Sequence, residues 1–229
     1  MRENCPGKSF PIGASVTADG VNFCVYSEHA RAIELLLFNQ AQDAQPAEVV
    51  FLDATANRTW HYWHVFIPGL RADQLYGYRV DGPRDLSAGL RFDRQKLLVD
   101  PYALAVANTE NYSRTKAALP GDNIDTALKS VVVDPTDYEW EGDAPLRRDF
   151  SDAVIYETHL AGFTRNPNSG VAAERRGTYA GFTEKVPYLL DLGIQTVEFL
   201  PVQQFDFQAS PTGVNYWGYQ SVAWFAPHR

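Results

Sequence analysis

The sequence predicts a multi-domain protein in which an all-β, immunoglobulin-like sandwich is followed by an α/β part. Two observations lead to this expectation. Short runs rich in β-branched and aromatic residues recur through the first hundred residues, separated by turn residues, which is typical of an antiparallel sandwich. After residue 150, two further runs flank a segment with helical periodicity, which is the pattern of a parallel strand, helix, strand unit.

The strand, helix, strand unit occupies residues 152–202. The expected strands are Ala153 to Leu160 and Thr196 to Val202, both short and rich in apolar residues. Strands joined by a helical crossover pair in parallel with a right-handed connection. A parallel unit of this kind belongs to a larger α/β sheet or barrel.

The helix between these strands has predictable ends. Thr178 is a candidate N-cap, and Gly193 lies where the chain must turn left-handed, with Ile194 placed to contact Leu189. Pro187 removes a backbone donor inside the pattern, so we expect a kink or a restart there. The apolar face of the helix consists of Phe182, Val186, Leu189 and Leu190.

The β part and its boundaries follow from the spacing of strands and turns. We assign residues 8–106 to the sandwich, 107–150 to a surface connector, and 151–229 to the α/β domain. The connector is rich in Pro, Asp and Gly and contains one expected strand, Ser130 to Val133. The strand segments of the sandwich are Val16 to Tyr26 with a turn at Asp19-Gly20, Ala32 to Asn39, Trp60 to Pro68, and Leu75 to Val80.

The composition excludes several classes of partner. The formal net charge of −8 argues against a nucleic-acid surface, because phosphate binding needs clustered Lys and Arg. No run approaches the ~18 apolar residues of a membrane span, and the first residues do not resemble a signal peptide, so we expect a cytoplasmic protein without a membrane partner. Cys5 and Cys24 are expected to be free thiols. No cofactor is expected, and the sequence defines no oligomeric state.

The expected strand from Trp60 to Pro68 begins with several aromatic residues. Strand alternation sends Trp60, Tyr62 and His64 to one face, and His61 and Trp63 to the other. Two readings stay open. The aromatics are core residues, or Trp60 and Trp63 form a flat platform for a sugar ring. The two histidines have no third ligand in sight, so we expect no metal site.

Candidate polar site residues lie in and after the two strands of the α/β part. Glu157 and Glu198 are candidates for the carboxylate pair that sugar hydrolysis needs. Their position within strands also fits polar residues that are hydrogen-bonded in the interior of a barrel. His159 lies nearer a strand end, where it could line a site. The same holds for Gln203, Gln204 and Asp206. No GxSxG elbow, phosphate-binding Gly loop or HExxH motif is present.

The last segment, NYWGYQSVAWFAPHR, carries the strongest chemical signal because five of its fifteen residues are aromatic. Here the sequence resembles the isoamylases and glycogen debranching enzymes of the α-amylase family. The motifs that carry the resemblance are PIGASVTADGVNFCVYS, WHVFIPGLRADQLYGYRVDGP, KLLVDPYA, KSVVVDP, VIYETHLAGFT, GTYAGFTEKVPYLLDLGIQTVEFLPV and NYWGY.

The resemblance implies a carbohydrate-binding module 48 type sandwich, then the start of a (β/α)₈ TIM barrel acting on α-1,6 branch points of glycogen or another branched α-glucan. It implies that Tyr219 stacks beneath the sugar at the cleavage subsite, with Tyr216 and Trp217 beside it. The family's catalytic aspartate, glutamate and second aspartate have no matching residue in this chain, so no catalytic residue is assigned. We therefore expect a fragment that is inactive alone, with a barrel short of the ~250 residues typical of that fold.

Three alternatives remain. Gln220 departs from the Asp or Asn that debranching enzymes carry after the tyrosine and resembles branching enzymes, whereas ETHLAGFT resembles debranching enzymes. A fragment of a branching enzyme is therefore one alternative. The second is a stand-alone glucan-binding or regulatory module. A poorly folded remnant without function is the third and least specific possibility.

Overall fold

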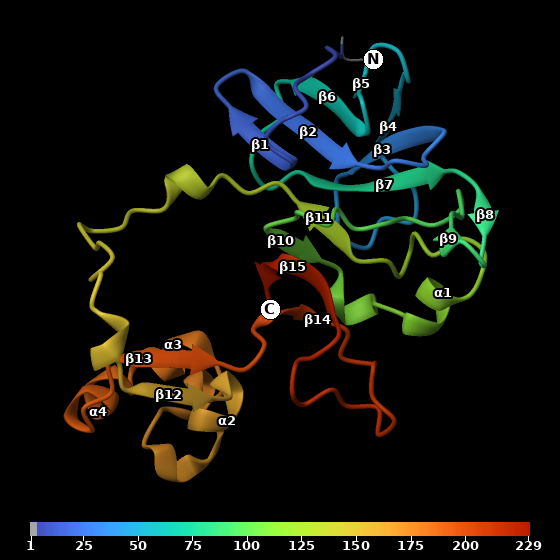
Figure 1. The fold of residues 1–229 in the computed structure, drawn as a ribbon. Coiled ribbons are helices and arrows are strands. Elements are labelled where there is room, and N and C mark those ends of the chain that lie inside the picture. The colour runs from blue at the N-terminus through green and yellow to red at the C-terminus, as the bar shows by residue number, and fades with distance from the viewer. Residues whose placement is uncertain (1–3) are drawn as a thin grey trace. The chain divides into compact units, whose positions relative to one another are not determined.

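The computed structural model describes residues 4–229, which divide into two compact units. The first unit contains the described residues up to Asp137, with Gln203–Val214 and Gln220–Arg229. The second contains Tyr138–Val202 with Asn215–Tyr219. Each unit is thus assembled from segments that are distant in the sequence, as the labels of Figure 1 allow the reader to follow.

The first unit is built on two antiparallel sheets. The four-stranded sheet has the order β1 (Gly13–Thr17), β2 (Gly20–Tyr26), β6 (Tyr62–Pro68) and β5 (Arg58–Thr59). The five-stranded sheet has the order β10 (Ala105–Ala107), β11 (Lys129–Val131), β7 (Leu75–Asp81), β3 (Ala32–Phe38) and β4 (Glu48–Leu52). All strand pairs in both sheets are antiparallel, which confirms the predicted β-rich amino-terminal part.

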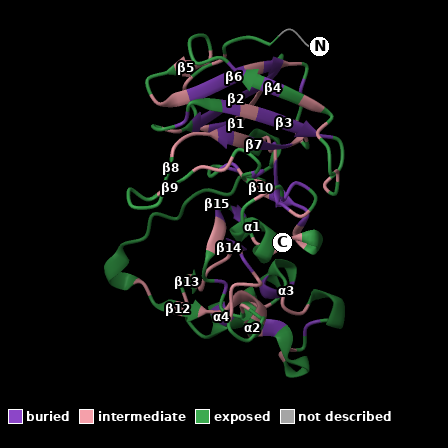
Figure 2. Cartoon of the chain, turned by 90° about the vertical axis from the view of Figure 1, so that its right-hand side faces the viewer, coloured by how far each residue is buried: buried purple, intermediate pink, exposed green. Residues whose placement is uncertain are grey.

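An apolar core joins the two sheets. Side chains of β2 and β6, such as Phe23 and Val65, pack in one buried cluster with Leu35 of β3 and Tyr76 of β7. Figure 2 shows the buried residues concentrated in these strands. Gly20 is required at the start of β2, because a Cβ there would lie 2.3 Å from the carbonyl oxygen of Ile67.

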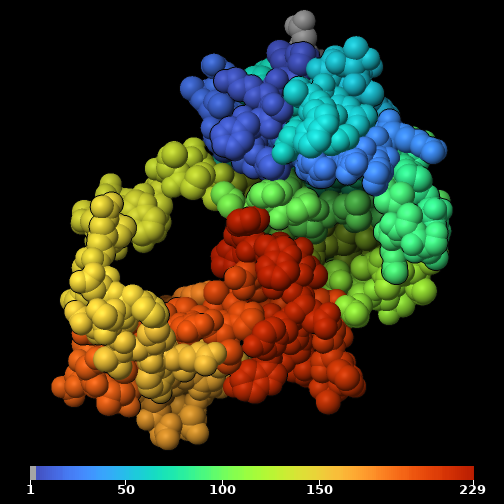
Figure 3. Space-filling model, viewed as in Figure 1, coloured from blue at the N-terminus to red at the C-terminus, as the bar shows by residue number. Residues whose placement is uncertain are grey.

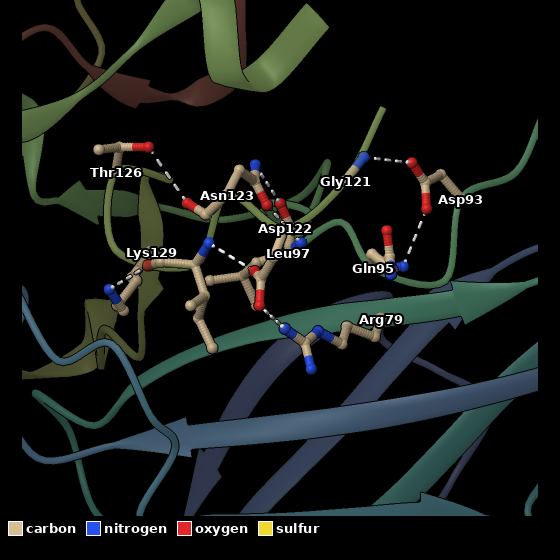
Figure 4. Close-up of polar contacts among 10 residues, drawn as sticks. Arg79, Asp93, Gln95, Leu97, Gly121, Asp122, Asn123, Thr126 and Lys129 are labelled. Atoms are coloured by element: carbon tan, nitrogen blue, oxygen red, sulfur yellow. Dashed lines mark hydrogen bonds and ion pairs between the residues drawn. The ribbon is translucent and has the colours of Figure 1, made fainter. Parts of the chain in front are cut away.

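Buried polar contacts hold segments of residues 92–132 together (Figure 4). The side-chain oxygen of Asn123 accepts from the Leu97 N–H at 2.8 Å, and its amide donates to the Leu97 carbonyl at 3.3 Å. Lys129 is fully buried and donates to the carbonyl oxygens of Ala41 and Ile124. Sequence analysis assigns residues 107–150 to a connector, whereas β11 within that range is an inner strand of the five-stranded sheet.

Short elements complete the first unit. Strands β14 (Gln203–Phe205) and β15 (Ser221–Pro227) pair with each other, and Ala223 and Ala226 pack in a buried cluster with Ala103 and Val106. Figure 3 shows the red carboxyl-terminal segment against the green residues near 100. The remaining elements are β8 (Arg84–Asp85), β9 (Leu90–Arg91), η1 (Thr109–Asn111), α1 (Arg114–Ala118) and η2 (Pro135–Asp137).

The second unit contains the predicted parallel unit. Strands β12 (Ile155–Thr158) and β13 (Thr196–Phe199) pair in parallel, with Ile155 opposite Thr196, which confirms the expected pairing. The described residues form a two-stranded parallel sheet and no barrel. The helical elements are η3 (Phe150–Asp152), α2 (Leu160–Arg165), η4 (Pro167–Ser169), η5 (Ala173–Arg175), α3 (Tyr179–Thr183) and α4 (Val186–Asp191).

The crossover helix is split into α3 and α4, and its two ends are as predicted. The Thr178 hydroxyl caps α3 by accepting from the Gly181 N–H at 3.1 Å. At the far end Gly193 has a φ of 84°, and the Ile194 N–H donates to the Leu189 carbonyl at 2.9 Å.

The expectation of one apolar face over the whole crossover is wrong in part. Phe182 and Leu189 are buried, but Val186 and Leu190 are exposed. The helix is interrupted between Thr183 and Val186, and Pro187 occupies the first turn of α4. The helical period therefore does not run through the break.

Candidate functional site: an aromatic turn on the second unit

Residues 215–219 form a compact turn, here called the aromatic turn, that exposes three aromatic rings. The side-chain oxygen of Asn215 accepts from the Gly218 N–H at 3.2 Å, and its amide donates to the Tyr219 carbonyl. Gly218 has a φ of 77°, a left-handed conformation that glycine adopts without steric cost. Asparagine at the start and glycine three residues later are a recognisable turn signal, which sequence analysis did not use.

His159 holds the aromatic turn against the end of strand β12. Its Nδ1 accepts from the Gly162 N–H at 2.9 Å, which caps helix α2. Because Nδ1 is an acceptor there, the ring carries its proton on Nε2, which donates to the Tyr216 carbonyl oxygen at 2.7 Å. The imidazole also stacks on the Tyr216 ring, with centroids 4.4 Å apart and planes 3° apart.

Gly162 makes room for this arrangement. A Cβ at this position would lie 2.7 Å from the Tyr216 hydroxyl oxygen. Any larger residue would push the tyrosine ring out of its stack with His159. Within ETHLAGFT, His159 and Gly162 are therefore needed to seat the aromatic turn, and strand β12 does not itself require them.

The three rings of the aromatic turn are available to a ligand. The exposed fractions of Tyr216, Trp217 and Tyr219 are 45%, 54% and 55%. Trp217 meets the edge of Tyr216 at 5.4 Å and 81°, so the two rings present faces in different directions. Exposed aromatic faces with hydroxyl and indole donors suit a ligand that has apolar faces and many hydroxyl groups, such as a sugar.

The carboxylate pair considered from the sequence lies in the middle of the parallel sheet. Glu157 and Glu198 are directly opposite each other in the register of β12 and β13, and both are exposed. They do not lie after the strand ends, where His159 and the aromatic turn are found. We therefore do not include Glu157 and Glu198 in the candidate site.

The polar residues after β13 belong to the first unit and have structural partners. Asp206 is buried; its Oδ2 contacts Arg114 Nη1 and accepts from the Tyr112 hydroxyl at 3.2 Å. Burial and the nearby carboxylate raise the pKa of Tyr112 to about 12. Gln204 is also buried, and its amide donates to the Phe205 carbonyl at 3.0 Å. Asp206 and Gln204 thus have partners within the first unit, where they stabilise the β14–β15 region.

The structure separates the two tryptophans of the expected aromatic platform, since one is buried and the other is exposed. Trp63 has an exposed fraction of 0% and is part of the core, so it cannot offer a face to a sugar. Trp60 precedes the strand, in a turn with φ 55°, and has an exposed fraction of 68%. Strand alternation did not apply to Trp60 because β6 begins only at Tyr62.

Histidine and acidic residues in the described part of the chain do not gather into a metal site. Within residues 4–229, no group of three or more His, Cys, Asp or Glu side chains is arranged to hold an ion. His64 is buried, and its two ring nitrogens contact the Thr59 hydroxyl and the Pro6 carbonyl oxygen. In the same residues, no helix has the length and hydropathy needed to cross a membrane. Cys5 is exposed and Cys24 is buried, and both are free thiols.

Comparison with known proteins finds similarity along nearly the whole chain. Residues 11–103 match carbohydrate-binding module 48, the isoamylase N-terminal domain. Isoamylase 1 of Oryza sativa subsp. japonica, a chloroplastic protein, is 40% identical over 96% of this chain and 28% of its own length. A glycogen debranching enzyme of Klebsiella pneumoniae is 40% identical over 99% of this chain and 35% of its own length.

Solved structures show the same fold. A pneumococcal glycogen-degrading virulence factor aligns with a TM-score of 0.74 and 20% identity, covering 97% of this chain and 24% of that one. The pullulanase of Bacillus acidopullulyticus aligns with a TM-score of 0.71 and 24% identity, covering 95% of this chain and 25% of that one. The chain thus spans about a third or less of the length of these relatives. It carries a carbohydrate-binding module 48 domain at residues 11–103 and is related over nearly its whole length to the isoamylases and glycogen debranching enzymes.

Proposed function

We propose that this chain is the amino-terminal, glucan-docking part of an enzyme that hydrolyses α-1,6 branch linkages in glycogen-like glucans. The observation that carries the proposal is the aromatic turn: three exposed rings held in place by His159, in a chain whose relatives are isoamylases and glycogen debranching enzymes. Tyr219 is the residue that stacks beneath a glucose ring, and Tyr216 and Trp217 bound the same subsite.

The proposal includes a division of labour along the chain. Residues 8–106 form most of the carbohydrate-binding sandwich, 107–150 add strand β11 to its five-stranded sheet and then connect the two parts, and 151–229 contain the first strand, helix, strand portion of a TIM barrel. The parallel pairing of β12 and β13 supports the barrel assignment, since barrel strands are parallel and separated by helices. His159 directly follows the end of strand β12 and contacts Tyr216 of the aromatic turn, and barrel enzymes bind their substrates at such strand ends.

The catalytic carboxylates of such an enzyme are not assigned to any residue of this chain. The chain supplies substrate contacts, and Glu157 and Glu198 are not proposed as an acid and nucleophile. A cytoplasmic location is part of the proposal, supported by the two free thiols among the described residues.

The proposal is tested by measuring glycogen binding and sugar release with the same preparation. The 229-residue chain is expected to be retarded in a native gel that contains glycogen and to release no reducing sugar from it. Tyr219→Ala is expected to weaken binding about tenfold, which corresponds to about 1.4 kcal/mol of binding free energy. Tyr138→Ala is the matched control, because Tyr138 is also exposed on the second unit but lies outside the aromatic turn. Measurable release of reducing sugar, or equal binding by the two variants, would contradict the proposal.

A further inference from the structure

The core of the sandwich is not completely filled near the end of β2. A cavity of about 350 Å³, here called the core cavity, lies inside the first unit. Its inner wall comes from the facing sides of both sheets, with Val25 of β2, Ile33 of β3, and Tyr78 and Val80 of β7. Its outer wall is the segment 91–101, which contributes Phe92 and Leu98. The core cavity is thus mostly apolar and has residues of both sheets in its lining.

Hydrogen bonds fix the outer wall in place. The Tyr78 N–H donates to the Leu98 carbonyl oxygen at 2.9 Å, and the Leu98 N–H donates to the Tyr78 carbonyl oxygen at 2.8 Å. The Asp93 carboxylate accepts from the N–H groups of Gln95 at 3.0 Å and Gly121 at 3.3 Å (Figure 4). The segment that closes the core cavity is therefore anchored both to strand β7 and to the loop at Gly121.

The wall of the core cavity contains a hydroxyl group without a partner. Tyr78 lines the core cavity and is buried, and its hydroxyl oxygen has no hydrogen-bond partner among residues 4–229. On the same strand, the buried Tyr76 hydroxyl donates to Asp100 at 2.8 Å. Burial, together with the nearby Asp100, raises the pKa of Tyr78 well above its ordinary value, so this hydroxyl keeps its proton and is a donor. Because buried donors are nearly always hydrogen-bonded, the missing acceptor points to an occupant of the core cavity.

The charged residues of the lining favour a neutral occupant. The Lys96 ammonium donates to the Lys116 carbonyl oxygen, and the Asp93 carboxylate is held by the backbone N–H groups described above. Arg91 is exposed to solvent. An anionic acceptor beside Tyr78 would be repelled by Asp100, whose negative charge already contributes to the raised pKa of Tyr78.

We propose that the core cavity binds a small neutral molecule, mostly apolar, whose single hydrogen-bond acceptor pairs with the Tyr78 hydroxyl. Ligand pockets in proteins have volumes of about 300–1,000 Å³ and apolar linings with a few polar groups that orient the ligand, and the core cavity has both properties. An α-glucan is the wrong occupant, because its many hydroxyl groups would lose their hydrogen bonds to water against an apolar lining. The core cavity and the aromatic turn therefore take different ligands, and either assignment can fail without the other.

The test uses the 229-residue chain and two ligands of the same shape, acetophenone and α-methylstyrene. The carbonyl oxygen of the first is replaced by a CH₂ group in the second, so only acetophenone can accept from the Tyr78 hydroxyl. Binding is followed by NMR on the methyl resonances of Val25, Ile33 and Val80, which line the core cavity. Both ligands are expected to shift these resonances to saturation, and maltoheptaose is expected to leave them unchanged.

Two variants separate the hydroxyl from the space around it. Tyr78→Phe removes an oxygen that has no partner, so it is expected to melt at the same or a higher temperature. Its affinity for acetophenone, relative to that for α-methylstyrene, should fall about fivefold, the size expected for one hydrogen bond. Val80→Phe places a ring in the core cavity and should abolish the binding of both ligands.

Tyr76→Phe is the matched control, because it removes a buried hydroxyl that is bonded to Asp100 and lies outside the lining. It should melt at a lower temperature and keep the affinity ratio of the unchanged chain. The proposal is overturned if neither ligand shifts the lining methyl resonances, if maltoheptaose shifts them, or if Tyr78→Phe has the same affinity ratio as the unchanged chain. Glycogen binding that depends on Tyr219 would stand in each of these cases.

Discussion

Asp100 is a carboxylic acid without exposed surface in the sandwich. It accepts hydrogen bonds from the Tyr76 hydroxyl and the Tyr102 N–H, each at 2.8 Å. Burial nevertheless raises the pKa of Asp100 to about 6. The folded chain therefore holds this proton to a higher pH than the unfolded chain does. The resulting stabilisation is complete below the unfolded pKa of about 4 and is lost as the pH rises to about 6.

Asp100→Asn is predicted to remove this pH dependence. The asparagine amide can still accept from the Tyr102 N–H and can donate to the Tyr76 oxygen, so the hydrogen bonds persist in number. Relative to the unchanged chain, the free energy of unfolding of the variant should rise by about 2 kcal/mol between pH 4 and pH 6, which is the larger part of the about 3 kcal/mol that the whole shift is worth at about 1.4 kcal/mol per pKa unit. Urea unfolding followed across this pH range measures the difference. A difference that stays constant with pH would show that Asp100 is ionised in the folded chain.

Single residues also show what the sequence could and could not predict. Thr178 and Gly193 were identified from local chemistry, because a capping hydroxyl and a left-handed glycine act within one turn of helix. Trp60 and Trp63 could not be separated, because burial depends on where the strand starts and on the opposite sheet.

At the level of elements, His159 joins strand β12, helix α2 and the aromatic turn. His159→Asn keeps an N-cap for α2, since asparagine is a favoured capping residue, but removes the imidazole that stacks on Tyr216 and donates to its carbonyl. We predict that amide exchange of Trp217 and Gly218 becomes faster in this variant while α2 stays protected. His159→Ala should speed exchange in the aromatic turn and also in α2, and the lost N-cap alone should lower the free energy of unfolding by about 1 kcal/mol.

The matched control for His159 is Thr178→Ala. This change removes the hydroxyl that caps helix α3 and leaves His159 and its contacts with Tyr216 in place, so it should lower protection in α3 and leave Trp217 unchanged. Unaltered exchange at Trp217 and Gly218 in His159→Asn would mean that the turn is held by Asn215 alone.

Element pairing sets the limit of sequence reasoning in this chain. The parallel pair β12–β13 was predictable, because its strands and crossover are contiguous. Strand β15 was not: its residues WFAP read as an aromatic wall, and only their contact with Ala103 and Val106 across more than a hundred residues defines them as a packed strand. The inner position of β11 has the same origin, since its neighbours β10 and β7 come from different parts of the sequence.

At the level of the whole molecule, the first unit depends on one ion pair that links distant segments. Arg114 contacts the buried carboxylate of Asp206, 92 residues away, beside the Tyr112 hydroxyl. Arg114→Ala removes this charged contact to a buried carboxylate and is predicted to lower the free energy of unfolding by about 2 kcal/mol. Denaturant unfolding gives the value.

Arg94→Ala is the comparison for this pair. Arg94 contacts Glu34 at 2.9 Å but has an exposed side chain, so its loss should cost about 0.5 kcal/mol or less. Equal effects of the two substitutions would indicate that the Arg114–Asp206 pair is no stronger than a surface contact.

The central claim is that the exposed rings of the aromatic turn contact an α-glucan. The five tryptophans give five indole N–H resonances, which can be followed by NMR during a titration with maltoheptaose. The account predicts that the resonance of Trp217, which is exposed, shifts with saturation, while that of Trp63, which is buried in the core, does not. A titration in which Trp217 does not respond would contradict it.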